Sequence, residues 1–353
     1  MRPLHTRFLA LVGALTLLAA VLVQAPRPAL AQNAAPVVTM YVPLSEDEIA
    51  AALQSMAVGS GLTIGSNIQT TISITVAVDG ALVYYDHWED GFESDIANPT
   101  AGSSQVWGDG DATNGIPPGY AVDVLNAGSV IVLDNGGTLA TPRTAAVEAY
   151  DGRDKIAATR GIALTRAGWE ATYGTLHAGS VAAFDTTKFG TNFTFPIGEN
   201  IASNFAFQYT GASIMATQDG TTVELDTNGD GTPDQTAVLN EGQTLFANGG
   251  ISAGGTVTAD APVQVHLMTG DVGATFEGRW YELFPDNLVS DSYVAATGTT
   301  EVGNEPAIFL FNPGSSAITV DITLSTGPDS VVVPAGGTVS YLMPNGSGGR
   351  FES

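Results

Sequence analysis

Apolar residues alternate with small or polar residues along most of the chain. In Ile72-Ser73-Ile74-Thr75-Val76 every second position is apolar, which is the period of a strand with one buried face. Asp79-Gly80 follows as a hairpin signal and predicts that this strand returns directly as residues 81–85. Further strands are predicted at residues 130–133, 162–164, 181–184, 213–216, 263–267, 308–311, 318–324 and 339–342. The pattern therefore predicts an all-β fold.

One short N-terminal helix interrupts this pattern, at residues 45–58. Ser45 is an N-cap residue, and Glu48 three positions later completes a capping box. Ile49, Leu53 and Met56 fall on one face of the helix. Gly59 follows the last of them, where glycine commonly ends a helix.

The turns suggest a division of the remaining chain into two or three β-sandwich-like units. A recurring pattern of an apolar anchor, a turn ending at glycine and a strand is centred on Gly128, Gly179, Gly242 and Gly336. We expect an N-terminal β-rich unit at residues 32–204, a central β unit at 205–300 and a C-terminal sandwich-like unit at 301–353, which can be incomplete.

The first 31 residues predict export. Basic residues precede an apolar stretch at residues 8–23, and Ala29-Leu30-Ala31 forms a small-x-small cleavage site. This is the pattern of a signal peptide at residues 1–31, and the apolar stretch is shorter than the ~20 residues of a membrane-spanning helix. We therefore expect a secreted or cell-surface protein with no membrane insertion after cleavage.

Composition restricts the partners and the chemistry. The chain has 36 acidic and 11 basic residues, a net charge of −25. Three basic residues and no acidic ones lie in residues 1–31, so cleavage leaves 8 minus 36, or −28. Nucleic acid and anionic membranes are therefore improbable partners. The chain has no cysteine and only 4 histidines, one of them in the signal peptide, which disfavours zinc or thiol enzymes.

A calcium-type loop is predicted at residues 226–234. Its candidate ligands, at the spacing of a calcium loop, are Asp226, Asn228, Asp230, Thr232 through its carbonyl, and Asp234. Gly231 permits the sharp turn, but Ala237 stands where an EF-hand has a bidentate glutamate, and both flanks have strand character. A structural calcium ion is the expected cofactor. The alternative is an exposed turn without an ion.

One short segment is denser in functional side chains than any other. Residues 84–95 hold five acids, one histidine and four aromatic residues. These groups suggest a ligand site, a second cation site or, as the alternative, the acid and base of a glycoside-active enzyme. The candidate residues are Asp86, His87, Trp88, Glu89, Asp90, Glu93 and Asp95, with Trp107, Asp109 and Asp111 expected to fold back toward them. A third possibility is a strand end whose aromatic residues are in the core and whose acids face water.

Basic residues cluster within residues 153–166. Arg153, Lys155, Arg160 and Arg166 make up half of the basic residues outside the signal peptide. In so acidic a chain we expect them to pair with the acids of residues 84–95 and to fix their geometry.

Two stretches resemble known protein families. The motifs Tyr84-Tyr-Asp-His-Trp-Glu-Asp-Gly and Asp154-Lys-Ile-Ala-Ala-Thr-Arg160 resemble the N-terminal region of large bacterial secreted or surface proteins. The segment from Ser213 to Val223, with Leu239-Asn-Glu-Gly242, is similar to the N-terminal domain of the IgGFc-binding protein. The resemblance implies an extracellular β-rich module of an adhesive or envelope-associated protein. It brings no catalytic residue with it.

Together these features predict a secreted, calcium-stabilised β-rich surface or adhesion module that is not an enzyme. Its partner would be an extracellular protein or a glycan surface. The alternative is a carbohydrate-binding module, or a glycoside-active enzyme that uses the acids of residues 86–95. A carbohydrate-binding module would expose Trp88, Trp107 or Trp169 in a planar row. The oligomeric state stays open.

Overall fold

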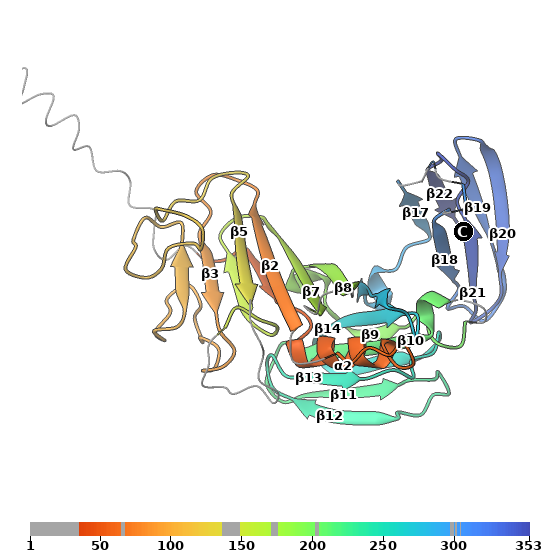
Figure 1. Ribbon diagram of the computed structural model, residues 1–353, viewed down its shortest axis with the longest axis horizontal. Coiled ribbons are helices and arrows are strands. Elements are labelled where there is room, and N and C mark those ends of the chain that lie inside the picture. The colour runs from red at the N-terminus through yellow and green to blue at the C-terminus, as the bar shows by residue number, and fades with distance from the viewer. Residues whose placement is uncertain are drawn as a thin grey trace, which may run out of the picture.

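A computed structural model describes residues 35–64, 68–135, 149–170, 176–201, 205–296, 300, 302–303 and 305–353. In these residues the chain is built mainly of strands, with a single α-helix, so the predicted all-β fold is confirmed (Figure 1). Every strand predicted above overlaps an observed strand. The predicted signal peptide lies outside the described residues. Within them, no helix is long and apolar enough to cross a membrane.

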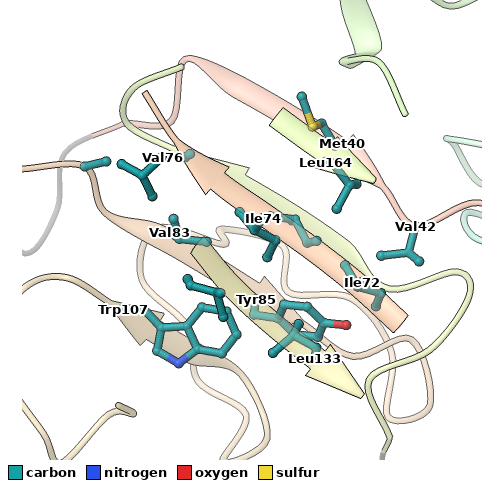
Figure 2. Close-up of a cluster of buried hydrophobic side chains, with 14 of the residues drawn as sticks. Met40, Val42, Ile72, Ile74, Val76, Val83, Tyr85, Trp107, Leu133 and Leu164 are labelled. Atoms are coloured by element: carbon teal, nitrogen blue, oxygen red, sulfur yellow. The ribbon is translucent and has the colours of Figure 1, made fainter. Parts of the chain in front are cut away.

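The N-terminal part is a sandwich of two sheets. The first sheet has the order β1 (Val38–Tyr41), β6 (Lys155–Ala158), β3 (Val83–Asp86) and β4 (Gln105–Trp107). The second has the order β15 (Phe276–Glu277), β8 (Leu176–Ala183), β7 (Ile162–Glu170), β2 (Ile68–Val76) and β5 (Val130–Asn135). Apolar side chains from both sheets form one core, in which Ile72 and Ile74 of β2 face Val83 and Tyr85 of β3 (Figure 2).

The predicted hairpin at Asp79-Gly80 is wrong. β2 pairs with β5 and β7, whereas β3 pairs with β4 and β6, so the turn carries the chain from one sheet to the other. Both strands bury their apolar positions in the shared core. Alternation fixes which face of a strand is buried, but two strands that face each other across a sandwich show the same alternation as two strands of a hairpin.

The central part is a seven-stranded sheet. Its main path is β12 (Gln235–Leu239), β11 (Thr221–Asp226), β14 (Thr256–Gly270), β10 (Tyr209–Ala216) and β13 (Thr244–Ala247), and β9 (Gly190–Thr194) and β16 (Arg279–Leu283) also pair with β14. Of three short 3-10 helices, η2 (Phe205–Phe207) and η3 (Asp286–Leu288) contact this sheet, and η1 (Thr186–Lys188) contacts β1.

Helix α2 (Glu46–Met56) packs both on this sheet and on the second sheet of the sandwich (Figure 1). The predicted capping box is confirmed, because the Ser45 side chain accepts from the Glu48 N–H and the Glu48 carboxylate accepts from the Ser45 N–H. Ile49, Leu53 and Met56 are fully buried, as their spacing predicts. The helix therefore joins the sandwich to the central sheet through one apolar core.

Two strand pairings cross the expected boundary near residue 204. β9 lies within residues 32–204, yet it pairs with β14 of the central sheet. In the opposite direction, β15 lies within residues 205–300 but pairs with β8 of the sandwich. The two parts thus exchange strands across this boundary.

The C-terminal part stands beside the central sheet (Figure 1). One sheet has the order β17 (Ser292–Ala295), β22 (Gly349–Glu352), β19 (Ile318–Leu324) and β20 (Gly327–Val333), and β18 (Ala307–Phe311) pairs with β21 (Thr338–Leu342). These strands bury their own small core. Phe309 stacks edge-on against Phe207 of the central part, with ring centroids 4.8 Å apart.

The recurring glycine pattern holds at three of its four positions. Gly128, Gly242 and Gly336 have φ values of +83°, +77° and +59°, as left-handed turn residues do. Gly179 instead lies within β8, opposite Gly168 of β7. A Cβ atom on Gly179 would lie 2.2 Å from Cε2 of Trp280, so this glycine makes room for an indole ring rather than for a turn.

Candidate functional site

The predicted acidic and aromatic segment begins in the core and ends in a surface loop. Tyr84, Tyr85 and Asp86 of β3 are buried, and so is His87, whereas Asp90 is exposed. Antiparallel pairing places Tyr85 opposite Ile156 and Asp86 opposite Lys155. The end of β3 therefore lies beside the chain that enters β6.

His87, Glu89 and Asp154 converge at this point. One ring nitrogen of His87 and one carboxylate oxygen of each acid all lie within 4.8 Å of one another. His87 Nδ1 is 3.6 Å from Asp154 Oδ2 and 3.2 Å from the carbonyl oxygen of Ala149. The Ala149 carbonyl oxygen can only accept, so the Nδ1–H tautomer makes this bond and orients the ring. We call these three residues the histidine–carboxylate cluster.

Asp154 is fully buried and accepts several hydrogen bonds. The Tyr85 hydroxyl donates to Oδ2 (2.5 Å), and the Trp88 N–H donates to Oδ1 (3.2 Å). Complete burial raises the pKa of the Asp154 carboxyl well above its ordinary value, and the charge of Glu89 adds to the effect. A buried carboxylate close to another acid is costly unless a proton or a cation neutralises it.

Backbone constraints hold the loop that carries Asp154. A Cβ atom on Gly152 would lie 2.5 Å from the Leu44 carbonyl oxygen, so only glycine fits between this loop and the start of α2. The next residue, Arg153, has a φ of +89°, and its guanidinium lies 4.9 Å from the centroid of the Trp88 ring. Trp88 Nε1 in turn donates to Asp151 Oδ1 (3.1 Å). The loop and the segment after β3 are thus locked together.

The other acids of this segment accept hydrogen bonds from neighbouring residues of the same loop. Glu93 accepts the N–H groups of Thr100 (2.6 Å) and Ala101 (2.5 Å), and these bonds lower the pKa of its carboxyl. Asp90 accepts the Ser103 hydroxyl, and Asp95 accepts the Ala97 N–H. These carboxylates fold the loop back on itself and do not converge with the histidine–carboxylate cluster.

Asp86 links this loop to the core. It accepts the Glu93 N–H (2.9 Å) and the Ser104 hydroxyl (3.1 Å). Desolvation by burial raises the pKa of Asp86 to about 6. Its oxygens are occupied by the loop that it anchors.

Trp107 packs against Tyr85, with ring centroids 5.4 Å apart, whereas Asp109 and Asp111 continue away from the end of β3. β3 and β4 are antiparallel with Val83 opposite Trp107, so the chain after Trp107 emerges at the start of β3, whereas His87 follows its end. Trp107 is fully buried in the sandwich core (Figure 2). Asp109 and Asp111 thus emerge at the start of β3 and not beside His87, and a planar surface row cannot include the buried Trp107.

Asp109 instead lies beside Asp123. Burial, and then the contact with Asp109, raise the pKa of the Asp123 carboxyl to about 6. Asp123 also accepts the N–H groups of Gly108 (2.5 Å) and Gly110 (2.7 Å). Asp111 accepts from Thr113 in the same turn. These acids shape a turn next to β4.

The predicted calcium-type loop joins β11 and β12, so both flanks are strands as expected. Asp226 is buried and accepts the N–H groups of Asn228 (3.1 Å), Gly229 (2.7 Å) and Gly231 (2.7 Å). The remaining candidates are exposed: Asn228, Asp230, Thr232 and Asp234. Asn228 and Asp230 accept the N–H groups two residues on, and Asp234 accepts the Thr227 N–H. These side-chain oxygens thus accept backbone N–H groups of the loop itself.

Two of the clustered basic residues pair with acids outside residues 84–95, and the charge of Lys155 also favours the ionised form of Asp86. Lys155 bonds Glu241 at 2.7 Å, and Arg166 bonds Glu46 of α2. Each pair joins parts of the chain that are far apart in sequence. Their role in the fold is to connect sheets to each other and to the helix.

The sequence did not indicate Asp151 and Asp154 as site residues, because they were grouped with the basic residues beside them. A usable signal was present: Asp151-Gly-Arg-Asp154 precedes a buried strand, as Tyr85-Asp86-His87 ends one. Comparison with protein-family models, with curated proteins and with solved structures finds no match to this chain.

Proposed function

We propose that this chain is a secreted or cell-surface β-rich module, non-enzymatic, that is stabilised by divalent cations and serves in surface attachment to an extracellular protein or glycan. The observation that carries the cation part is the convergence of His87, Glu89 and Asp154 within 4.8 Å. One imidazole and two carboxylates are the donors that Mn²⁺ and Zn²⁺ accept, whereas Ca²⁺ prefers oxygen ligands alone.

Calcium fits the loop between β11 and β12 better. That loop offers oxygen donors only, at the spacing of a calcium loop. Both sites connect elements of the fold: the loop closes a hairpin, and the histidine–carboxylate cluster ties the end of β3 to the start of β6. An ion at either place would therefore stabilise the fold rather than activate water.

The arrangement of the other acids supports a non-enzymatic role. Hydrolysis of a glycoside needs two carboxyl groups that face one substrate. Asp86, Glu93 and Asp95 instead accept hydrogen bonds from the chain around them. Their carboxylates are used to hold a loop.

Thermal unfolding of the chain in excess chelator, followed by separate titrations with Ca²⁺, Mn²⁺ and Zn²⁺, tests the proposal. A native-state ligand raises the midpoint as its concentration exceeds Kd. We expect Glu89→Gln to remove the response to Mn²⁺ or Zn²⁺ and to leave the response to Ca²⁺. Asp90→Asn, which changes a neighbouring exposed acid, is the matched control and should respond as the wild type does. A midpoint that no ion moves would reject the cation-stabilised module.

A further inference from the structure

Three polar side chains are buried together on one face of the central sheet. Gln264 and His266 are two positions apart on β14, so both point to the same face, and Glu282 of β16 lies opposite His266. Gln264 is 1% exposed, and the side chains of His266 and Glu282 are 3% and 4% exposed. We call these three residues the β14–β16 site. None of them belongs to a site predicted from the sequence.

The face that carries this site is the one covered by α2. Met268, the next residue of β14 on this face, packs with Trp280 in the apolar core under the helix. On the other side of β14, Ser213 of β10 lies opposite His266, and its hydroxyl donates to Glu48 of α2 (3.1 Å). The β14–β16 site therefore lies at the end of that core, where apolar contacts give way to polar groups.

Several polar atoms at this place are buried without a hydrogen bond. Within the residues that the structure describes, His266 Nε2, Gln264 Oε1 and Glu48 Oε1 have no partner. A buried polar atom left in this state costs about 1–3 kcal/mol. Nearly all buried polar atoms in proteins do have a partner, so three such atoms around one junction indicate a ligand that binds them.

The spacing of the side chains fits a metal ion. His266 Nε2 is 3.7 Å from Glu282 Oε2, which is too far for a hydrogen bond. Two atoms bound to the same zinc ion at about 2.0–2.2 Å are about 3.4–3.7 Å apart. Burial raises the pKa of the Glu282 carboxyl to about 8, while the Phe184 N–H and the Gln264 side chain oppose this shift, so Gln264 also lies beside that carboxyl.

Charge also favours a cation here. A buried carboxylate is costly unless a proton or a cation neutralises it, and a divalent ion would balance the charges of Glu282 and Glu48 together. With no ion bound, a proton neutralises Glu282 instead. We propose that the β14–β16 site binds a divalent transition-metal ion of the Zn²⁺ class through His266 Nε2, Gln264 Oε1 and the Glu282 carboxylate. Such an ion accepts one imidazole nitrogen together with oxygen ligands.

The role of this ion would be structural, because α2 covers its ligands. Since they are buried, we expect the ion to enter during folding and to exchange slowly afterwards. Titration of the folded chain therefore reports the histidine–carboxylate cluster, whereas the β14–β16 site is loaded by refolding. This inference does not depend on the histidine–carboxylate cluster or on the calcium-type loop.

The test uses the full chain with Glu89→Gln, which removes one ligand of the histidine–carboxylate cluster. The chain is unfolded in urea with chelator and refolded with Zn²⁺, in the presence of excess Ca²⁺ to occupy the oxygen-only loop. A desalting column then removes free ions, and mass spectrometry counts the zinc that remains. We expect about one zinc ion per chain.

Two substitutions in this background should each remove that ion. Glu282→Gln is isosteric and still accepts the Phe184 N–H, and His266→Phe keeps a ring of similar size. Circular dichroism checks that each variant folds, and either variant is sufficient for the test if the other does not. Glu224→Gln, at an exposed glutamate of the same sheet, is the matched control and should keep the ion.

Three results would overturn the proposal. The first is a Glu89→Gln chain that holds no zinc after refolding. The second is zinc that remains in folded Glu282→Gln or His266→Phe chains. The third is zinc that Glu224→Gln removes as completely as Glu282→Gln does. The first result leaves the proposed function standing if the wild-type chain responds to the ion, so the two failures are distinguishable.

Discussion

Glu46, in the first turn of α2, and Arg166, in the middle of β7, form an ion pair with side chains that are 1% and 0% exposed. Glu46 also accepts the Thr70 hydroxyl (2.7 Å) and the Gly152 N–H (3.3 Å). The same carboxylate thus joins the helix, the second sheet and the loop that carries Asp154. This contact links the fold of the helix to the geometry of the histidine–carboxylate cluster.

Removing Arg166 should be strongly destabilising. Arg166→Met leaves Glu46 buried without its partner, and breaking a buried pair in this way costs about 3–5 kcal/mol. Urea unfolding measures the loss. Arg350→Met is the control, because Arg350 is 57% exposed where it pairs with Glu352 and such pairs contribute little. Equal midpoints for the two variants would contradict the importance of the buried pair.

Substitutions of Asp226 and Asp230 in the calcium-type loop should have different effects on stability. Asp226→Ala removes the acceptor of three backbone N–H groups, so it should cost about 1–3 kcal/mol even in chelator. Asp230→Ala should change little in chelator, because Asp230 is exposed, but should abolish the stabilisation by calcium, which is about 2.7 kcal/mol at 100-fold Kd. Thermal unfolding with and without calcium distinguishes the two. If Asp230→Ala keeps the full calcium response, the loop does not bind the ion.

Stability should fall as the pH rises from 6.5 to 8. Burial, with a smaller contribution from Asp185, raises the pKa of Glu282 from 4.5 to about 8, and burial lowers that of His266 from 6.5 to about 3. An acid whose pKa is raised in the folded state contributes stability that is fully present below its unfolded-state pKa. This contribution is lost as the pH rises through the folded-state pKa. A histidine whose pKa is lowered in the folded state contributes stability that is fully present above pH 6.5. This contribution is lost as the pH falls toward 3. The two effects oppose each other from 4.5 to 6.5. Above 6.5 the buried acids with raised pKa values, Glu282 and Asp154, both lose their contribution as the pH rises.

Urea unfolding at pH 6.5 and pH 8 measures this loss, which should be about 2 kcal/mol. Glu282→Gln should reduce it, since glutamine does not titrate and still accepts the Phe184 N–H. Glu224→Gln, at an exposed glutamate of the same sheet, should retain it. A Glu282→Gln variant with the wild-type slope would show that other groups cause the decline.

Substitution of Gly179 should displace Trp280. The added methyl group of Gly179→Ala would lie 2.2 Å from the ring, and overpacking of this kind costs about 1–3 kcal/mol. Near-ultraviolet circular dichroism should report the changed indole environment alongside a lower melting temperature. Gly102→Ala is the control, because nothing lies within 4 Å of its added methyl group. An unchanged spectrum and midpoint in Gly179→Ala would contradict the packing described above.

Local patterns in the sequence were sufficient to predict the helix and most of the strands. The capping box at Ser45 and Glu48 and the strands flanking residues 226–234 are set by neighbours within a few positions. Those signals are local because a cap or a turn is satisfied by hydrogen bonds within its own segment. The acids of the calcium-type loop were recognised for the same reason, since their spacing along the chain is the signal.

Only the tertiary structure decided which strands share a sheet and which acids meet. The Asp79-Gly80 turn carries the chain from one sheet of the sandwich to the other, and Gly179 lies in a strand that packs against the Trp280 ring. Neither could be predicted, because alternation specifies the buried face of a strand but not the partner of that face. His87 and Asp154 are 67 positions apart by their numbers, and the pairing of β3 with β6 brings them together. Long-range pairing of this kind depends on burial of the whole core, so it cannot be predicted from a short stretch of sequence.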